Sequence, residues 1–186
     1  MSTLIPRLGF EELAPEVADG LRAKVARLGY LGEFFAATAH QPQALKAFMD
    51  FTEFSKGELD MRLVELIALT VATIKHVAYE RNQHERLAVR LGYGRAWIAA
   101  VEALAPDDQP ELSREERTVQ RFVISAVRSN GIEGSMLLDA VVEQLGVKRA
   151  VAVLFVMGRY TTHAIIVNSL AITAPVPSIF EDGFNG

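Results

Sequence analysis

The hydrophobic pattern divides the chain into helices and gives no convincing strand. Residues 60–92 stand out, because residues 63–74 are apolar with three exceptions, of which Glu65 is the only charged one. A helix that is apolar on all sides lies inside a protein. We therefore expect a central helix here, with Glu65 in or near the core. Residues 147–172 have the same character and predict a second buried helix.

Shorter segments with apolar residues at helical spacing surround these two. Ser113 and Glu116 have the spacing of a capping box at a helix start. The expected helices span residues 15–28, 31–39, 42–56, 96–104, 113–129 and 135–145. We therefore predict an all-α fold, with a single domain over residues 1–186.

The two ends of the chain lack sustained periodicity. Residues 1–14 contain Pro6 and Gly9, and residues 174–186 contain two prolines that cannot continue a helix. We interpret both segments as arms, at the N-terminus and the C-terminus. Arms at both ends of a small helical domain often wrap a neighbouring subunit.

Composition narrows the functional classes. The chain of 186 residues is 50% hydrophobic, which is enough for a sizeable core, and its net charge of −4 comes without a basic stripe that could follow nucleic acid. The first residues do not have the pattern of a secretory signal, and the longest apolar run, residues 150–158, is too short to span a bilayer. We expect a cytoplasmic protein without nucleic-acid or membrane partners.

The polar part of the central segment carries most of the candidate chemistry. Residues 75–86 contain two of the four histidines. In a continuous helix, His76, Glu80 and His84 would stack on one face, because residues four apart are neighbours. A carboxylate and an imidazole there can exchange protons. The same three side chains could bind a metal, but the tight His-Glu-x-x-His form is absent, and we predict no metal and no cofactor.

The spacing of these residues resembles the carboxymuconolactone decarboxylase and AhpD-like alkylhydroperoxidase superfamily. In its peroxidase branch a Glu precedes a Cys-x-x-Cys pair by twelve residues, and a His follows the second Cys by four. The corresponding residues here are Glu65, Val77, Glu80 and His84, with Tyr79 beside Glu80. Peroxidase chemistry needs a thiolate, and the chain has no cysteine, so thiol peroxidase activity is excluded. The resemblance is to a Cys-free branch with decarboxylase-like members.

The resemblance, which covers about residues 41–177, implies an AhpD-like helical bundle in which two helices meet near residues 74–76. It also implies a homo-oligomer, a trimer or a hexamer, and an enzyme that moves protons on a small organic acid or lactone. The implied catalytic residues are Glu65, Glu80 and His84, with Glu80 orienting His84. The implied substrate-binding residues are Tyr79, His76, Arg159 and His163.

Simpler interpretations remain open for each of these residues. Glu65 could form a salt bridge with Arg62 on the same helix, and Glu80 with His84 could be an ion pair facing solvent. His163 could be a core histidine, whereas Arg159 in an apolar helix needs a partner, either a substrate carboxylate or Glu65. Instead of an enzyme, the protein could be a non-catalytic oligomer that binds a small molecule.

Overall fold

The protein consists of α-helices joined by short connections. A computed structural model describes residues 4–181 and 184, and within them there are nine α-helices, two 3-10 turns and no strand, which confirms the all-α prediction. The helices are α1 (Pro15–Leu28), α2 (Glu33–Thr38), α3 (Pro42–Phe54), α4 (Met61–Ile74), α5 (Ala78–Arg90), α6 (Arg95–Glu102), α7 (Arg114–Arg128), α8 (Ser135–Leu145) and α9 (Val147–Ser169).

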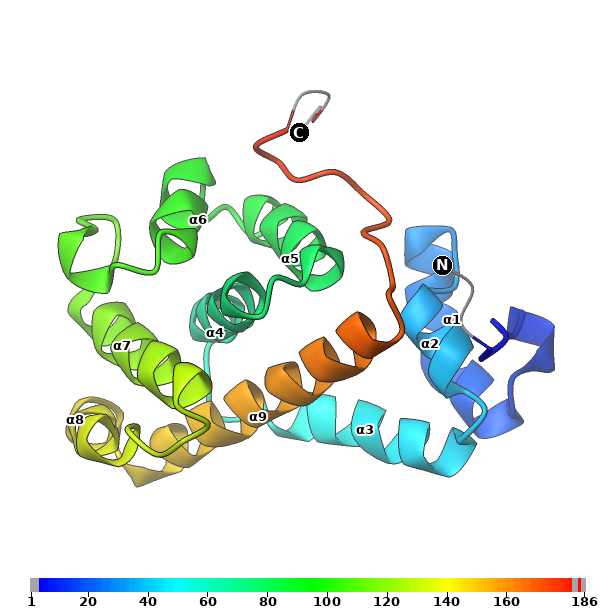
Figure 1. Cartoon of the computed structure of the whole chain (residues 1–186), viewed down its shortest axis with the longest axis horizontal. Coiled ribbons are helices and arrows are strands. Elements are labelled where there is room, and N and C mark those ends of the chain that lie inside the picture. Colours follow the sequence, from blue (N-terminus) through cyan, green and yellow to red (C-terminus); the bar gives the residue numbers. More distant parts are fainter. Residues whose placement is uncertain (1–3, 182–183, 185–186) are drawn as a thin grey trace.

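The predicted central helix, α4, lies in the middle of the larger part of the molecule, where it packs against α5, α7 and α9 (Figure 1). Asp60 caps its N-terminus by accepting a hydrogen bond of 2.9 Å from the Leu63 amide. Leu66, Ile67 and Leu69 are completely buried. Burial of each such side chain contributes about 1.5–3 kcal/mol, which fixes α4 as a rigid support for its neighbours.

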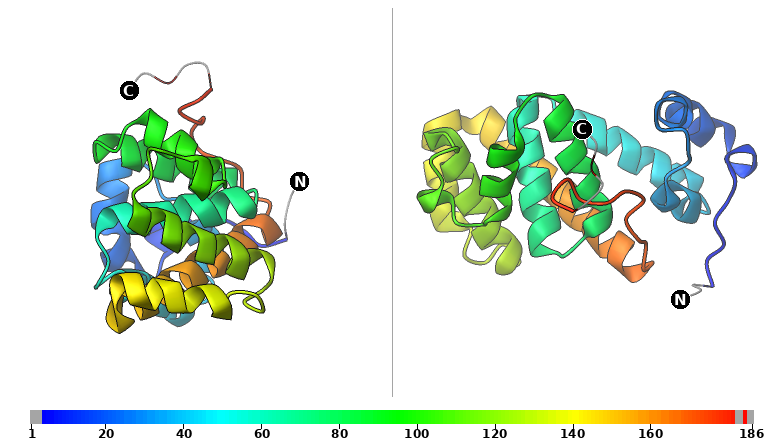
Figure 2. Two further views of the ribbon diagram at one scale, coloured as in Figure 1. Left: turned by 90° about the vertical axis from the view of Figure 1, so that its left-hand side faces the viewer. Right: turned by 90° about the horizontal axis from the view of Figure 1, so that it is seen from above.

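A second, smaller core forms at the N-terminal end of the molecule. Figure 2 shows α1 and α2 at one end of an elongated shape and α7 and α8 at the other, with α3 and α9 running between them. Leu21 and Phe34 pack there against Val167 near the end of α9. Because α9 belongs to both cores, its middle part faces the space between them.

The chain breaks its helical path between α4 and α5, as the family resemblance implied. α4 ends at Ile74, and α5 begins at Ala78 after Val77 as its N-cap. His76 lies in this turn with φ +54°, a left-handed conformation that stops the first helix. The break turns α5 back along α4, so that side chains 15 to 20 residues apart can meet.

By length and composition alone, α9 could cross a membrane, but half of its most apolar window is buried inside the protein. It also carries the buried charged residue Arg159. Both properties are those of a core helix.

Both predicted arms are attached to the helices within the described residues. The Leu8 amide donates a 3.0 Å hydrogen bond to the Ala36 carbonyl, and a 3-10 turn follows at Phe10–Glu12. Residues 174–181 run across α5 (Figure 1). Residues 1–3, 182–183 and 185–186, which also belong to the predicted arms, lie outside the described residues.

Candidate functional site

A cavity of about 950 Å³ lies where the two cores meet. Its walls come from α1, α3, α5 and α9, and Glu65 reaches it from α4. Phe35, Phe48 and Met49 supply apolar surface, while Glu80, His84 and Arg159 supply charge. An apolar hollow with a few converging polar groups is the usual form of a small-molecule site.

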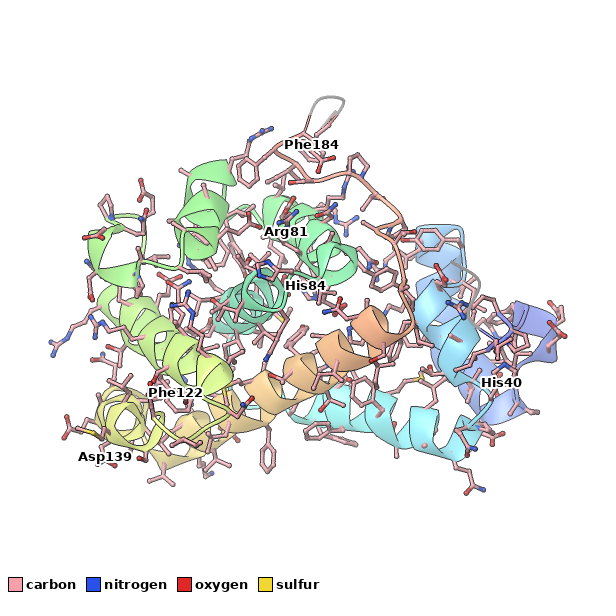
Figure 3. All side chains as sticks on the ribbon, viewed as in Figure 1. His40, Arg81, His84, Phe122, Asp139 and Phe184 are labelled. Atoms are coloured by element: carbon pink, nitrogen blue, oxygen red, sulfur yellow. The ribbon has the colours of Figure 1, made fainter. Side chains whose placement is uncertain are left out.

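His84 lies between two carboxylates at this cavity. Its Nδ1 is 2.7 Å from Glu65 Oε2, and its Nε2 is 3.5 Å from Glu80 Oε1. Glu65 is 1% exposed, and the His84 side chain is 15% exposed. Figure 3 shows His84 on the side of α5 that faces the interior. The structure thus brings together the three residues predicted to be catalytic.

Glu80 is the centre of a charged network. Its Oε1 accepts a hydrogen bond of 3.1 Å from Arg159 Nη1, and its Oε2 lies 3.0 Å from His163 Nδ1. Arg159 also donates from Nε to Thr52 Oγ1 at 3.0 Å, and its guanidinium lies 4.3 Å from the centre of the Tyr160 ring. The partner that Arg159 needs is therefore Glu80, not Glu65.

These contacts determine the protonation states. Burial disfavours the charged form of Glu80, but His163, His84 and Arg159 outweigh it and hold the Glu80 pKa well below its usual range. Burial likewise opposes the charged form of His84, but Glu65 and Glu80 raise the His84 pKa to about 9. Burial lowers the pKa of His163. At neutral pH the site therefore holds an imidazolium at His84 and a neutral imidazole at His163.

Tyr79 lies in the cavity wall but directs its hydroxyl toward the start of α2. The Phe34 backbone bonds to it, and a Cβ atom at Gly32 would lie 2.8 Å from Tyr79 Oη, so a larger residue at Gly32 would displace the hydroxyl. Burial and the nearby Glu80 raise the Tyr79 pKa to about 12. At this position Tyr79 shapes the pocket and keeps its proton.

His76, which the resemblance implied as a substrate-binding residue, does not share a face with Glu80 and His84, because the helix that would align them is not continuous. His76 precedes α5, is exposed, and does not line the cavity. The reason is the turn between α4 and α5, which places His76 outside the helical register. Within residues 4–181 and 184, no group of three or more His, Asp or Glu side chains is arranged to hold a metal ion.

The simpler interpretations of Glu65 and Glu80 also fail. Arg62 does not pair with Glu65, because its Nε bonds to Glu116 Oε1 at 2.7 Å. Glu80 and His84 face the interior, not solvent. His163 is buried, but its nearest polar contact is a carboxylate.

Several cavity residues were not predicted from the sequence, Thr52 and Lys24 among them. Thr52 lies one turn after Phe48 on α3. Lys24 lies on the polar side of α1, with its Nζ 4.6 Å from the centre of the Phe35 ring. A lysine or threonine on an amphipathic helix carries no signal of a site. The aromatic residues Phe35 and Phe48 also line the cavity.

Comparison with family models matches the middle of the chain, and comparison with solved structures matches most of the fold. Residues 42–109 match the sequence model of the carboxymuconolactone decarboxylase family. This range includes Glu65, Glu80 and His84 but not Lys24, Arg159 or His163. No curated protein matches the sequence.

Several solved structures share the fold at low sequence identity. The debrominase Bmp8, in a variant crystallised with 2,3,4-tribromopyrrole, has a TM-score of 0.81 at 15% identity, over 95% of this chain and 94% of that chain. A peroxidase-related alkylhydroperoxidase AhpD core protein from Ralstonia eutropha JMP134 has a TM-score of 0.77 at 13% identity, over 93% and 94%. An AhpD-type antioxidant defence protein of unknown function from Agrobacterium tumefaciens has a TM-score of 0.68 at 18% identity, over 74% and 94%.

At these identities the structural likeness shows the fold alone. The fold and the match over residues 42–109 together confirm that this chain resembles the carboxymuconolactone decarboxylase and AhpD-like superfamily, as a protein without cysteine.

Proposed function

We propose that the protein is a carboxymuconolactone decarboxylase-like enzyme that acts on a small organic acid or lactone by proton transfer. The observation that supports this most is the position of His84, held 2.7 Å from a buried carboxylate at the wall of a cavity. An imidazole held in this way has a fixed orientation and a proton to give.

The different surroundings of the two ring nitrogens of His84 support a different role for each. Nδ1 is occupied by Glu65, whereas Nε2 is 3.5 Å from Glu80, beyond the usual hydrogen-bond distance. The Nε2 proton is therefore the transferable one. Glu80 already contacts Arg159 and His163 through its two oxygen atoms. Its proposed role is therefore to position His84 and Arg159.

A decarboxylation next to a carbonyl or lactone group would use these groups as follows. The C–C bond to the leaving carboxylate breaks, CO₂ departs, and the electron pair moves onto the substrate oxygen as an enolate. The cations His84 and Arg159 stabilise this developing charge. His84 Nε2 then protonates the carbon, Glu65 stabilises the changing charge on the ring, and a solvent proton restores the imidazolium.

The charge of the cavity favours an anionic ligand. Seven of its lining residues are basic and four are acidic, although the chain as a whole has a net charge of −4. Lys24 forms no ion pair with any residue that the structure describes. A cavity with an excess of positive charge raises the local concentration of anionic ligands. The basic residues are Lys24, Arg27, Lys46, Lys56, Arg86, Arg90 and Arg159.

The shared fold of Bmp8 adds modest support. Its crystal structure contains a small ring compound, 2,3,4-tribromopyrrole. A cavity of about 950 Å³ with aromatic walls is also large enough for a small ring. We infer a ligand of this size, with a carboxylate group, for this chain.

The test is turnover of a panel of lactone acids, with 2-oxotetrahydrofuran-3-carboxylate as the first compound, because its carboxylate is on the carbon next to the lactone carbonyl. Loss of a general acid costs about 10²–10⁴-fold in rate, so we expect His84→Ala and Glu65→Gln to lose at least about 10²-fold. His40→Ala is the matched control, because His40 is exposed and outside the cavity. Unchanged turnover of every converted compound in His84→Ala and Glu65→Gln would remove the assignment.

A non-catalytic binding protein is the second candidate. The observation that favours it is that both oxygen atoms of Glu80 already have protein neighbours, a hydrogen bond from Arg159 to Oε1 and His163 Nδ1 at 3.0 Å from Oε2. A thermal shift with lactone acids measures binding without chemistry, because a ligand that prefers the folded state raises the melting temperature. Binding of many compounds with turnover of none would favour this candidate.

We also propose a cytoplasmic homo-oligomer, a trimer or a hexamer, following the resemblance. In support, the outer faces of α3 and α9 expose large apolar side chains, among them Phe54 and Phe155. Exposed apolar surface of this kind often marks an interface. Light scattering coupled to size-exclusion chromatography measures the assembly, and a monomer at micromolar concentration would contradict the proposal.

A further inference from the structure

Residues 174–181 bind across α5 through a series of specific hydrogen bonds. Asn82 Nδ2 donates to the Val176 carbonyl at 2.8 Å, and Arg86 donates to the Pro177 carbonyl from Nη2 at 3.0 Å. Val176 and Arg86 both line the cavity. The segment therefore contributes one side chain, Val176, to the cavity wall and is bonded to a second lining residue, Arg86.

The strongest attachment is to a buried carboxylate. Glu85 Oε2 accepts hydrogen bonds of 2.7 Å from both Ser178 Oγ and the Ile179 amide. Glu85 and Ile179 are both completely buried. Arg81 lies on the side of α5 toward this segment (Figure 3), and its Nε is 3.2 Å from Glu85 Oε1 without making a hydrogen bond.

A second carboxyl group meets Glu85 from α6. Glu102 lies within hydrogen-bonding reach of Glu85. Glu85 Oε1 and Glu102 Oε1 are both buried, and neither has a hydrogen-bond partner among the described residues. Two carboxylates in contact repel each other, but one proton between them gives both oxygen atoms a partner. Arg81 is the other charged group that acts on the pair.

We propose that residues 174–181 form a latch on the cavity, and that one proton shared between Glu85 and Glu102 holds this latch closed. Ser178 and Ile179 of the latch donate hydrogen bonds to Glu85 Oε2. The shared proton lies at Glu85 Oε1, the other oxygen of the same carboxyl group. Loss of the proton places a second negative charge beside Glu85, which favours separation of α6, α5 and the latch. The proposal does not rest on the proposed reaction, because no substrate takes part in it.

The direction of the pH effect follows from the closed state. Burial and the Glu85 charge raise the Glu102 pKa to about 8, whereas a solvated glutamate has an ordinary pKa. The closed latch therefore holds a proton that the open latch releases, and closure weakens as pH rises from about 4.5 to about 8. Above about pH 8 both states have lost the proton, and the dependence ends.

The experiment is amide hydrogen exchange of the full-length protein between pH 5 and pH 9, corrected for the intrinsic exchange rate. One proton changes the closing constant by at most about tenfold per pH unit. We expect protection of the Ile179 amide to fall at least about fivefold between pH 6 and pH 8 and to level off above that. Protection that stays constant across this range in the wild-type protein would overturn the proposal.

A variant and a control make the result specific. Glu102→Gln gives Glu85 a permanent amide donor, so the protection of Ile179 should stay high and lose its pH dependence. Glu143→Gln, on the exposed side of α8, should keep the wild-type dependence. If Glu102→Gln retains the wild-type slope, or Glu143→Gln loses it, the pair does not control the latch.

Discussion

Glu80 and Glu85 lie five residues apart on α5, and both are buried, yet they have opposite surroundings. Glu80 meets Arg159, His84 and His163, and its pKa lies well below the usual range. Glu85 meets the carboxyl group of Glu102, whose pKa rises to about 8. The first face of α5 therefore holds fixed charges at neutral pH, and the second holds a proton.

This difference shows that burial alone does not decide the charge of a carboxyl group. Burial disfavours the ionised form in both places, and the neighbours decide whether it persists. The face with cations lines the cavity and can stabilise charge in a reaction. The face with two carboxyl groups touches the end of the chain and can respond to pH. One helix thus carries residues of both the proposed site of proton transfer and the proposed latch.

The largest expected change in the free energy of unfolding comes from removing Arg159, the cation beside Glu80. Arg159→Met leaves Glu80 without its guanidinium partner, and breaking a buried ion pair from one side costs about 3 kcal/mol or more in the free energy of unfolding. Urea denaturation at pH 7 measures it. Arg121→Met breaks the exposed pair with Asp107 and should cost less than about 1 kcal/mol. Equal losses of unfolding free energy in the two variants would mean that the buried Arg159–Glu80 pair stabilises the fold no more than an exposed pair does.

A smaller effect comes from neutralising the second face. Because the Glu102 pKa is raised in the folded state, wild-type stability falls as pH rises from about 4.5 to about 8, and Glu102→Gln does not share this loss. Linkage between pKa values of about 4.5 and about 8 corresponds to about 2.5 kcal/mol between pH 6 and pH 8.5. Because Glu102 is partly exposed, solvent screens this effect, and we expect the stability gained by Glu102→Gln to be about 1.5 kcal/mol greater at pH 8.5 than at pH 6. Urea denaturation at both pH values tests this, and the same gain at both would contradict it.

The smallest effect comes from the neutral partner of the first face. Thr52→Val keeps the shape of the side chain but removes the oxygen that accepts from Arg159 Nε. Arg159 keeps Glu80, so the loss should be about 1 kcal/mol, the net value of one hydrogen bond. A loss as large as that of Arg159→Met would show that Thr52, and not Glu80, holds the guanidinium.

The sequence was sufficient for the helices because their signals are local. The ranges that apolar periodicity predicted, residues 15–28 and 135–145, coincide with α1 and α8, and the Ser113–Glu116 capping box marked the start of α7. The turn at His76 contains neither glycine nor proline, so the pattern allowed one long helix. Only the family resemblance indicated the break.

The site was harder to predict because its contacts join distant parts of the chain. The family spacing linked Glu65 to His84 over 19 residues, and the structure places them in contact. The partners of Glu80 are 79 and 83 residues away, and no local pattern reports that distance. The sequence around Glu85 gives no sign of its contacts, because its partners Glu102 and Ser178 come from other elements.

The most direct test of the proton-transfer account is the titration of the His84 ring by NMR from pH 5 to pH 10, with the signal assigned from a His84→Gln spectrum. The contacts with Glu65 and Glu80 predict a pKa of about 9, so the ring should stay protonated through neutral pH and lose its proton only above it. In Glu65→Gln the midpoint should fall. A wild-type midpoint at or below the ordinary histidine value of about 6.5 would contradict the account, because His84 would then hold no proton to donate at neutral pH.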